Sequence, residues 1–152
     1  MVFVYKITAL IIVFCLFDYA ATYTCSIGWH HGYRDNCYYF SRFSATFWSA
    51  MSFCKTVGGK LIEIDNYWEF QVLSRMARHR RFPDFWIGIT DMYSEGAWQK
   101  ATTQEQQTYF NWYESQPSNS GGHENCVEVY TKLGMKWNDR HGDHRLRFVC
   151  EK

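Results

Sequence analysis

Three histidines late in the chain are the residues whose type and spacing come closest to metal chemistry. His141 and His144 lie three positions apart, a spacing that on a helix would turn both imidazoles toward one zinc ion. Their surroundings, like those of His123, are typical of loops, and zinc hydrolysis also needs an open metal position and a general base. The chain contains no GxSxG, P-loop or HExxH motif. We therefore interpret the histidines as exposed loop residues and expect that the protein is not an enzyme.

A second group of candidate residues is basic. Arg75, Arg78, His79, Arg80 and Arg81 gather at the end of a predicted helix, where the helix dipole favours positive side chains. A solvated helix end accounts for them, and the functional alternative is a patch for acidic glycans or bacterial surface phosphates. The whole chain has 16 Lys and Arg against 15 Asp and Glu, a formal net charge of +1. Because positive charge drives nucleic-acid binding, we expect no nucleic-acid partner.

The N-terminus is typical of a secretory signal peptide. Met1 to Lys6 carries one positive charge, Ile7 to Phe17 is almost wholly apolar, and small residues follow. The apolar run is shorter than the roughly 20 residues that span a bilayer. We expect residues 1–21 to be removed, with cleavage between Ala20 and Thr24, and the mature protein to be secreted and extracellular without inserting into a membrane.

Residues 22–152 are then enough for one domain with one core, and an aromatic content of 20% argues against disorder. One of the six cysteines, Cys15, leaves with the signal peptide. Five thiols in an oxidising compartment allow at most two intrachain bridges, with one cysteine left over. The cysteines form no CxxC pair, so their spacing does not support a zinc ribbon. The five are Cys25, Cys37, Cys54, Cys126 and Cys150.

Short helices and strands are expected to alternate in the first half. The turn-rich segment from Cys25 to Phe40 suggests a hairpin closed by a Cys25–Cys37 bridge. Ser44 to Val57 has apolar residues at helical spacing and ends at a glycine pair. Asn66 with Glu69 resembles a capping box that opens a second helix, running to about Arg78. The apolar residues Leu61, Ile62 and Ile64, and the segment Phe85–Thr90, are expected to be strands.

The second half is loop-rich from Asp91 onward, with strands expected at Cys126–Tyr130, Leu133–Trp137 and Arg147–Cys150. Two early helices followed by strands and loops predict an α+β domain. Long loops in a compact domain usually carry function.

A set of short motifs runs in order through the mature chain. Its order and gaps resemble the C-type lectin domain, over the whole span from Cys25 to the C-terminus. The hairpin is similar to the long form of that family, and the chain resembles its secreted single-domain invertebrate members. The motifs are Cys54, Trp86-Ile87-Gly88-Ile89, Asn111-Trp112, Gln116-Pro117-Ser118, Glu124-Asn125-Cys126-Val127, Trp137-Asn138-Asp139 and Phe148-Val149-Cys150-Glu151.

The resemblance implies a double-looped α+β fold with two helices, small antiparallel sheets and a long ligand-binding loop region. It also implies a Cys54–Cys150 bridge and core positions for the Trp86 strand and for Trp112. Family members that bind sugar hold it through calcium, which needs about six to eight oxygen ligands, and the residue matching Pro117 is cis. The positions that match the calcium and sugar ligands are Gln116, Ser118, Glu124, Asn138 and Asp139.

Ser118 departs from the family pattern, which has Asn or Asp at this position. A hydroxyl is shorter and uncharged, so it holds the ion less well. Gln116 places an amide, which can donate a hydrogen bond, at the first position of the Gln116-Pro117-Ser118 triplet, as in the family's galactose-type triplet. The Ser118 hydroxyl at the third position can donate or accept, so it does not decide the sugar specificity. We therefore lean to galactose-type sugars. An auxiliary calcium is implied at Asp91, Glu95, Asn119 and Asn125, where the alternative is a solvated acidic loop.

Cys126 lacks its usual partner. In the family that cysteine lies a few residues after Trp-Asn-Asp, but Arg140 to His144 contains none. Cys126 is then either a buried thiol or a link to another chain in a homo-oligomer. The missing bridge is also expected to loosen the loop that carries Asn138 and Asp139.

Two functions follow from the resemblance. The favoured one is a secreted, calcium-dependent lectin that recognises glycans on microbial or cell surfaces. The alternative is a calcium-independent domain of the same fold that binds a protein or another surface ligand, a hypothesis that the serine and the missing cysteine motivate.

Overall fold

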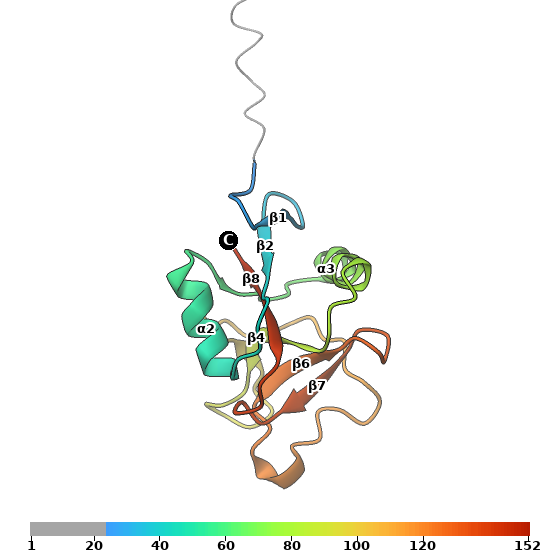
Figure 1. Ribbon diagram of the computed structural model, residues 1–152. Helices are drawn as coiled ribbons and strands as arrows, with labels where there is room; N and C mark the ends of the chain where they lie inside the picture. The colour runs from blue at the N-terminus through green and yellow to red at the C-terminus, as the bar shows by residue number, and fades with distance from the viewer. Residues whose placement is uncertain (1–23) are drawn as a thin grey trace, which may run out of the picture.

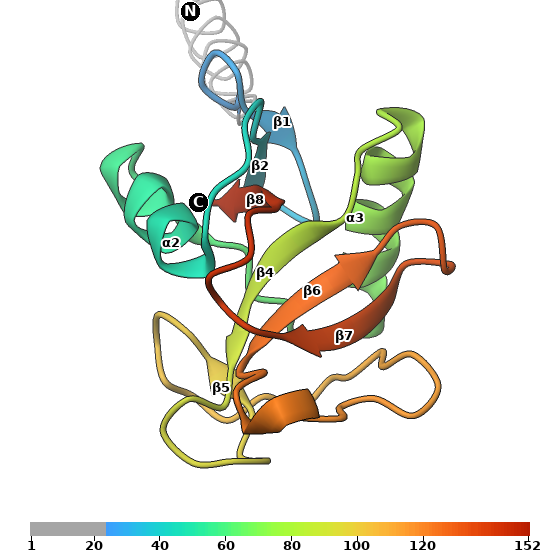
Figure 2. The same ribbon diagram turned by 60° about the horizontal axis from the view of Figure 1, so that its bottom comes forward.

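A computed structural model describes residues 24–152, so the signal peptide expected at residues 1–21 lies outside the described range. Two helices, α2 and α3, flank a central group of strands in both views (Figures 1 and 2). The expected α+β architecture is therefore confirmed. Within residues 24–152, no helix combines the length and the apolar character needed to cross a bilayer.

Helix α2 spans Phe47–Thr56 and begins where Thr46 Oγ1 accepts a hydrogen bond from the Ser49 amide at 3.2 Å. Such an N-cap satisfies an amide that the helix leaves free. The helix ends at Thr56 with Val57 as its C-cap, and Gly58 follows in the left-handed conformation, with a φ of +79° that glycine adopts without strain. The helix is shorter than the Ser44–Val57 expected, and its buried residues are Phe47, Ala50 and Cys54.

Helix α3 spans Tyr67–His79, and its cap confirms the role expected of Asn66. Asn66 Oδ1 accepts from the Glu69 amide at 3.0 Å. The Glu69 carboxylate returns to the Asp65 amide, at 2.8 Å, and also accepts from the Tyr38 hydroxyl at 3.1 Å. Glu69 thus fastens α3 to the strand that carries Tyr38.

The strands form one sheet in the order β1-β2-β8-β4-β6-β7, with β3 added to β8 and β5 added to β4. The β4–β8 pair is parallel and the other pairs are antiparallel. The strands are β1 (His30–His31), β2 (Cys37–Phe40), β3 (Lys60–Leu61), β4 (Phe85–Thr90), β5 (Gln99–Lys100), β6 (Cys126–Tyr130), β7 (Lys136–Arg140) and β8 (Arg147–Glu151).

The last hairpin differs from the sequence-based expectation. We expected a strand over Leu133–Trp137, but β7 starts at Lys136 because residues 131–135 form the turn after β6. Gly134 and Met135 have φ values of +74° and +68°, which no strand accommodates. Asn138 and Asp139 therefore lie inside β7, paired with β6, and not in the loop where we expected them.

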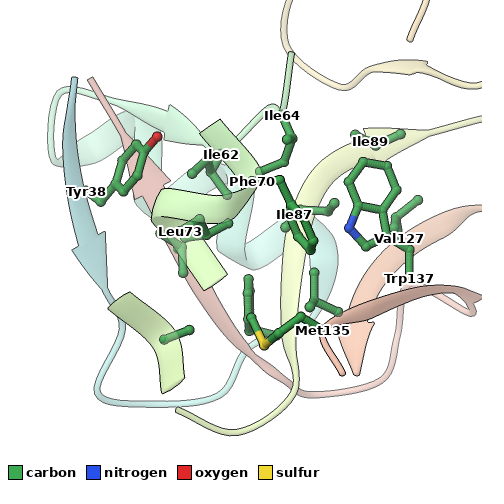
Figure 3. Close-up of a cluster of buried hydrophobic side chains, with 14 of the residues drawn as sticks. Tyr38, Ile62, Ile64, Phe70, Leu73, Ile87, Ile89, Val127, Met135 and Trp137 are labelled. Atoms are coloured by element: carbon green, nitrogen blue, oxygen red, sulfur yellow. The ribbon is translucent and has the colours of Figure 1, made fainter. Parts of the chain in front are cut away.

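The main hydrophobic core lies between α3 and the sheet (Figure 3). Trp137 is fully buried at its centre and meets Phe70 edge-on, with ring centroids 5.7 Å apart. Trp112 is partly buried and packs on Trp137 at 5.9 Å. Every residue of β4 is buried, as expected of the Trp86 strand. A second cluster, around Trp86 and Phe148, encloses the bridge that ties α2 to β8.

Both expected disulfides are formed, Cys25–Cys37 and Cys54–Cys150. The second joins residues 96 positions apart, and closing so long a loop contributes about 2–4 kcal/mol. Cys126 is the free cysteine of the described chain and is only 1% exposed. It is therefore a buried thiol, the first of the two alternatives, and burial raises its pKa.

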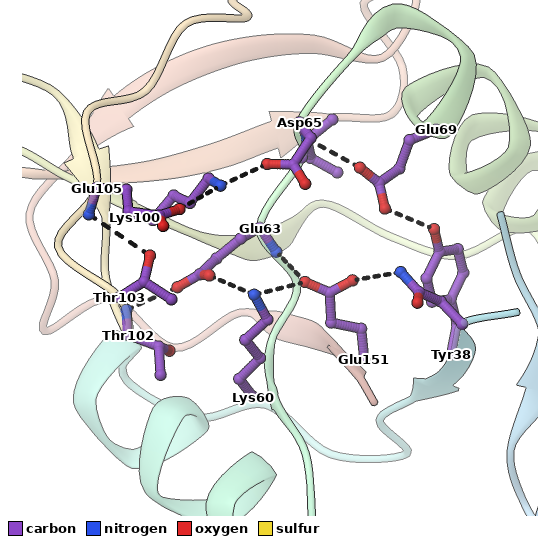
Figure 4. Close-up of polar contacts among 12 residues, drawn as sticks. Tyr38, Lys60, Glu63, Asp65, Glu69, Lys100, Thr102, Thr103, Glu105 and Glu151 are labelled. Atoms are coloured by element: carbon purple, nitrogen blue, oxygen red, sulfur yellow. Dashed lines mark hydrogen bonds and ion pairs between the residues drawn. The ribbon is translucent and has the colours of Figure 1, made fainter. Parts of the chain in front are cut away.

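A polar network of buried carboxylates ties β3 to β8 (Figure 4). Glu151 Oε1 accepts from the Glu63 amide at 2.9 Å, and Lys60 Nζ lies 3.5 Å from the same oxygen. Glu63 in turn accepts from the Thr102 amide at 2.6 Å. Burial raises the pKa of Glu151 to about 7.

Candidate functional site

The residues expected to bind ligand come from a long loop and one strand. The loop runs from β5 to β6 and contains the short helix η1 (Ser120–Gly122). In both views it lies at the end of the molecule opposite the β1–β2 hairpin (Figures 1 and 2). The Gln116–Pro117 peptide bond is cis, as the resemblance implies.

Asp139 fastens this loop to β7. It is fully buried, its Oδ1 accepts from the Ser118 amide at 3.0 Å, and its Oδ2 accepts from the Asn119 amide at 2.6 Å. Both carboxylate oxygens are thus turned toward the loop that carries the other candidate ligands.

Glu124 organises the other side of the same loop. Its Oε2 accepts from the Ser118 hydroxyl at 3.2 Å and from the Ser120 amide at 2.7 Å. Its own amide donates to Asn119 Oδ1 at 3.2 Å. Ser118 therefore contacts both candidate carboxylates, Glu124 through its hydroxyl and Asp139 through its amide.

Asn138 is held by Glu128, a residue that the sequence motifs do not single out. Its Nδ2 donates to Glu128 Oε1 at 2.8 Å, and Arg140 pairs with that same oxygen at 2.8 Å. Glu128 is fully buried and lies opposite Asn138 in the β6–β7 register. The sequence signal that could have identified Glu128 is its position between Val127 and Val129 in a buried strand, where a carboxylate needs a polar partner. With its nitrogen engaged, Asn138 has its amide oxygen left to bind a ligand.

Gln116 provides the test of whether the site fits a calcium ion. Its Oε1 is buried and has no hydrogen-bond partner, an arrangement that costs free energy unless a partner is supplied. Calcium prefers carboxylate and amide oxygens of the kind offered here. The donor set of Gln116, Glu124, Asn138 and Asp139 therefore fits calcium, and Ser118 adds a hydroxyl.

The auxiliary set is only partly organised. Asp91 is 2% exposed; its Oδ2 accepts from the Gly96 amide at 2.8 Å, and its Oδ1 is buried without a partner. Burial raises the pKa of Asp91, and the nearby carboxylates of Glu95 and Asp139 raise it further. Glu95 is exposed, while the backbone oxygen of Asn125 accepts from the Asp91 amide at 3.3 Å. The side-chain oxygen of Asn119 is already engaged by Glu124.

The histidines border this site without converging on it. The rings of His123 and His141 are exposed and meet edge-on, with centroids 6.3 Å apart. His144 lies 3.4 Å from an Arg140 nitrogen. Over residues 24–152, no three His, Cys, Asp or Glu side chains are gathered so as to hold a metal ion.

Comparison with known proteins identifies the family. The family model "Lectin C-type domain" matches residues 43–152. Perlucin of Haliotis laevigata is 34% identical over 130 residues, which are 84% of this chain and 83% of that protein. Perlucin-like protein of Mytilus galloprovincialis is 30% identical over 123 residues, 78% of this chain and 76% of that protein.

The fold leads to the same family. The human scavenger receptor C-type lectin carbohydrate-recognition domain superposes with a TM-score of 0.76 at 30% identity, covering 85% of this chain and 98% of that one. Fold and sequence thus define a domain of the carbohydrate-recognition type. This chain belongs to the C-type lectin domain family.

Proposed function

We propose that the protein is an extracellular, calcium-dependent lectin that binds glycans through Gln116, Ser118, Glu124, Asn138 and Asp139. The observation that carries the proposal is the buried, unpartnered Oε1 of Gln116. Gln116 lies on the long loop, in which the Ser118 amide donates to Asp139 and the Ser120 amide donates to Glu124. A cation would supply the missing partner.

The side chains divide the work of binding between them. Gln116, Ser118, Glu124, Asn138 and Asp139 would hold a calcium ion, which when bound would offer coordination to sugar hydroxyls. Gln116 can donate from its amide nitrogen and Asn138 presents its amide oxygen, while Glu124 accepts only. The amide of Gln116, the first residue of the Gln116-Pro117-Ser118 triplet, supports galactose-type sugars on microbial or cell surfaces as the ligand class.

A calcium-independent function is the second candidate, and a specific observation favours it. Hydrogen bonds within the protein already hold the loop closed, because both oxygens of Asp139 on β7 accept from loop amides and Ser118 donates to Glu124 within the loop. A loop ordered in this way could present a surface to a protein ligand without any ion.

Replacing Glu124 by Gln separates the two candidates. The change removes a ligand charge while keeping the acceptor for Ser120, so calcium binding should weaken at least tenfold and the fold should survive. The matched control is Glu114→Gln, an exposed acid of the same loop. Extracellular calcium modules bind at about 10⁻⁴–10⁻³ M, so 10 mM calcium should stabilise the wild type by about 1.4 kcal/mol or more. A melting temperature that calcium leaves unchanged in all three proteins would overturn the calcium-dependent proposal.

Localisation and assembly are also proposed. Residues 1–21 would act as a signal peptide, so the protein secreted from a eukaryotic cell should begin between Ala20 and Thr24. An intact N-terminus on the secreted chain would contradict this. Because Cys126 is buried, any homo-oligomer would form through another surface.

A further inference from the structure

Two adjoining hollows follow the exposed side of α3. The first, of about 610 Å³, is lined among others by Tyr33, Trp68, Arg75 and Arg78. The second, of about 370 Å³, shares Arg78 and continues over the turn between β6 and β7. Arg78 touches that turn through a contact of 3.4 Å to the Gly134 carbonyl oxygen. We call the two hollows together the α3 groove.

The α3 groove is cationic, and its charges are unpaired. Arg75 and Arg78 line the first hollow, and Arg78, Arg81 and Lys132 line the second, with no acidic side chain in either. None of these four makes an ion pair with an acid of residues 24–152. By contrast, Lys60, a cation of the polar network, is paired with carboxylates. In a chain of net charge +1, the groove is therefore a local concentration of free positive charge.

An exposed aromatic side chain stands at one end of this row of charges. Trp68 is 67% exposed, although an indole gains by burial. It lies on the same face of α3 as Arg75 and Arg78, about 10 Å and 15 Å along the helix axis. Tyr33 lines the same hollow. The groove therefore offers the flat apolar ring of Trp68, followed by the guanidinium groups of Arg75 and Arg78. Together these groups extend over more than the length of one monosaccharide.

This combination matches one ligand chemistry. An aromatic face packs on the C–H face of a sugar ring, and guanidinium groups bind planar or tetrahedral oxyanions through paired hydrogen bonds. We propose that the α3 groove is a second glycan site, which binds an extended anionic saccharide bearing sulfate or carboxylate groups without calcium. Neither hollow is lined by a residue of the long loop, so this site is separate from the loop site and goes beyond the function proposed for that loop.

The test uses the mature protein, a chelator and a heparin-derived octasaccharide as probe, with affinity measured by calorimetry. Arg75→Gln/Arg78→Gln should weaken binding at least tenfold, and Trp68→Ala at least threefold. The control, Arg42→Gln/Lys55→Gln, removes two exposed charges outside the groove and should stay within twofold of wild type. Glu124→Gln should bind the octasaccharide normally, which separates this site from the loop site.

Further arms define the ligand. A non-sulfated octasaccharide of uronic acids should bind through the same residues, and affinity should fall as the oligosaccharide is shortened to a disaccharide. Equal losses in the groove variant and the control would show general charge attraction and overturn the proposal. So would duplex DNA of matched charge that binds as tightly and is insensitive to Trp68→Ala, or an octasaccharide that does not bind.

Discussion

Asn138 donates its side-chain amide to Glu128 Oε1 over 2.8 Å, directly across the β6–β7 pair. The contact fixes which end of the amide remains available, so Glu128 is a positioning residue for the candidate calcium site. Residues that orient metal ligands typically change metal affinity by about 10–100-fold when lost.

Glu128→Ala should therefore weaken calcium binding about tenfold or more, while Glu128→Gln, which keeps an oxygen acceptor, should recover most of the affinity. Calorimetric titration with calcium measures both, at a temperature where circular dichroism shows each variant folded. Alanine and glutamine variants that both bind like the wild type would show that Asn138 needs no such support.

Ser118→Asn should strengthen calcium binding about tenfold. Asparagine would bring an amide oxygen of the kind calcium prefers in place of a short hydroxyl, although the 3.2 Å bond from Ser118 to Glu124 would be lost. Ser118→Ala is the matched control, because it removes the same bond and adds no ligand. Calorimetric titration should show calcium affinity decreasing from Ser118→Asn to the wild type to Ser118→Ala. If Ser118→Asn binds calcium more weakly than Ser118→Ala, position 118 does not supply a calcium ligand.

Gly142 offers a position for the missing third disulfide. A Cβ built there would lie 2.9 Å from Cys126 Sγ, close to the roughly 3.0 Å that an S–S length of about 2.04 Å implies. Gly142→Cys should therefore bond to Cys126, so that residues 24–152 keep no free thiol where the wild type has one. Closing a loop of this length contributes about 3 kcal/mol.

Gly142→Ser is the control for that bond, because its hydroxyl meets the same neighbours without forming a bridge. It should melt below the oxidised cysteine variant. Thiol titration of the unfolded chains gives the direct answer, and two free thiols in Gly142→Cys would refute the assigned geometry.

The buried carboxylate of Glu151 should make the protein less stable at pH 7 than at pH 5. Its pKa is raised to about 7 in the fold, against an ordinary value of about 4.3, so the native state binds more protons than the unfolded state between these values. Stability then falls as pH rises through this interval, by about 2–3 kcal/mol in all.

Glu151→Gln removes this titration and should flatten the change. Urea unfolding of both proteins at pH 5 and pH 7, with a chelator present so that calcium ligands do not contribute, checks the expectation. An equal pH dependence in the two proteins would assign the effect to another group.

Local patterns in the sequence predicted much of the fold. Asn66 and Glu69 sit three residues apart and cap α3 as expected, and the Cys25–Cys37 and Cys54–Cys150 bridges follow the family pattern. Such features depend on neighbours in the chain or on motifs with fixed gaps.

What the sequence did not reveal depends on register. Whether Glu128 supports Asn138 depends on where β7 starts, and the positive φ values of Gly134 and Met135 move that start past the apolar residues of the turn. The contact of Gly142 with Cys126 likewise joins residues on either side of the hairpin. The α3 groove combines helix residues with residues from the β6–β7 turn, so the basic cluster alone could not define it.

Glycan-array binding of the mature protein, with calcium and then with a chelator, is the decisive measurement for calcium-dependent sugar binding at the loop site. If the loop site is a calcium-dependent lectin site, the wild type should bind a set of galactose-bearing glycans in calcium and lose them in chelator. Glu114→Gln should behave like the wild type, and Glu124→Gln should lose the same glycans in calcium. Binding to those glycans that persists in chelator and in Glu124→Gln would contradict the account.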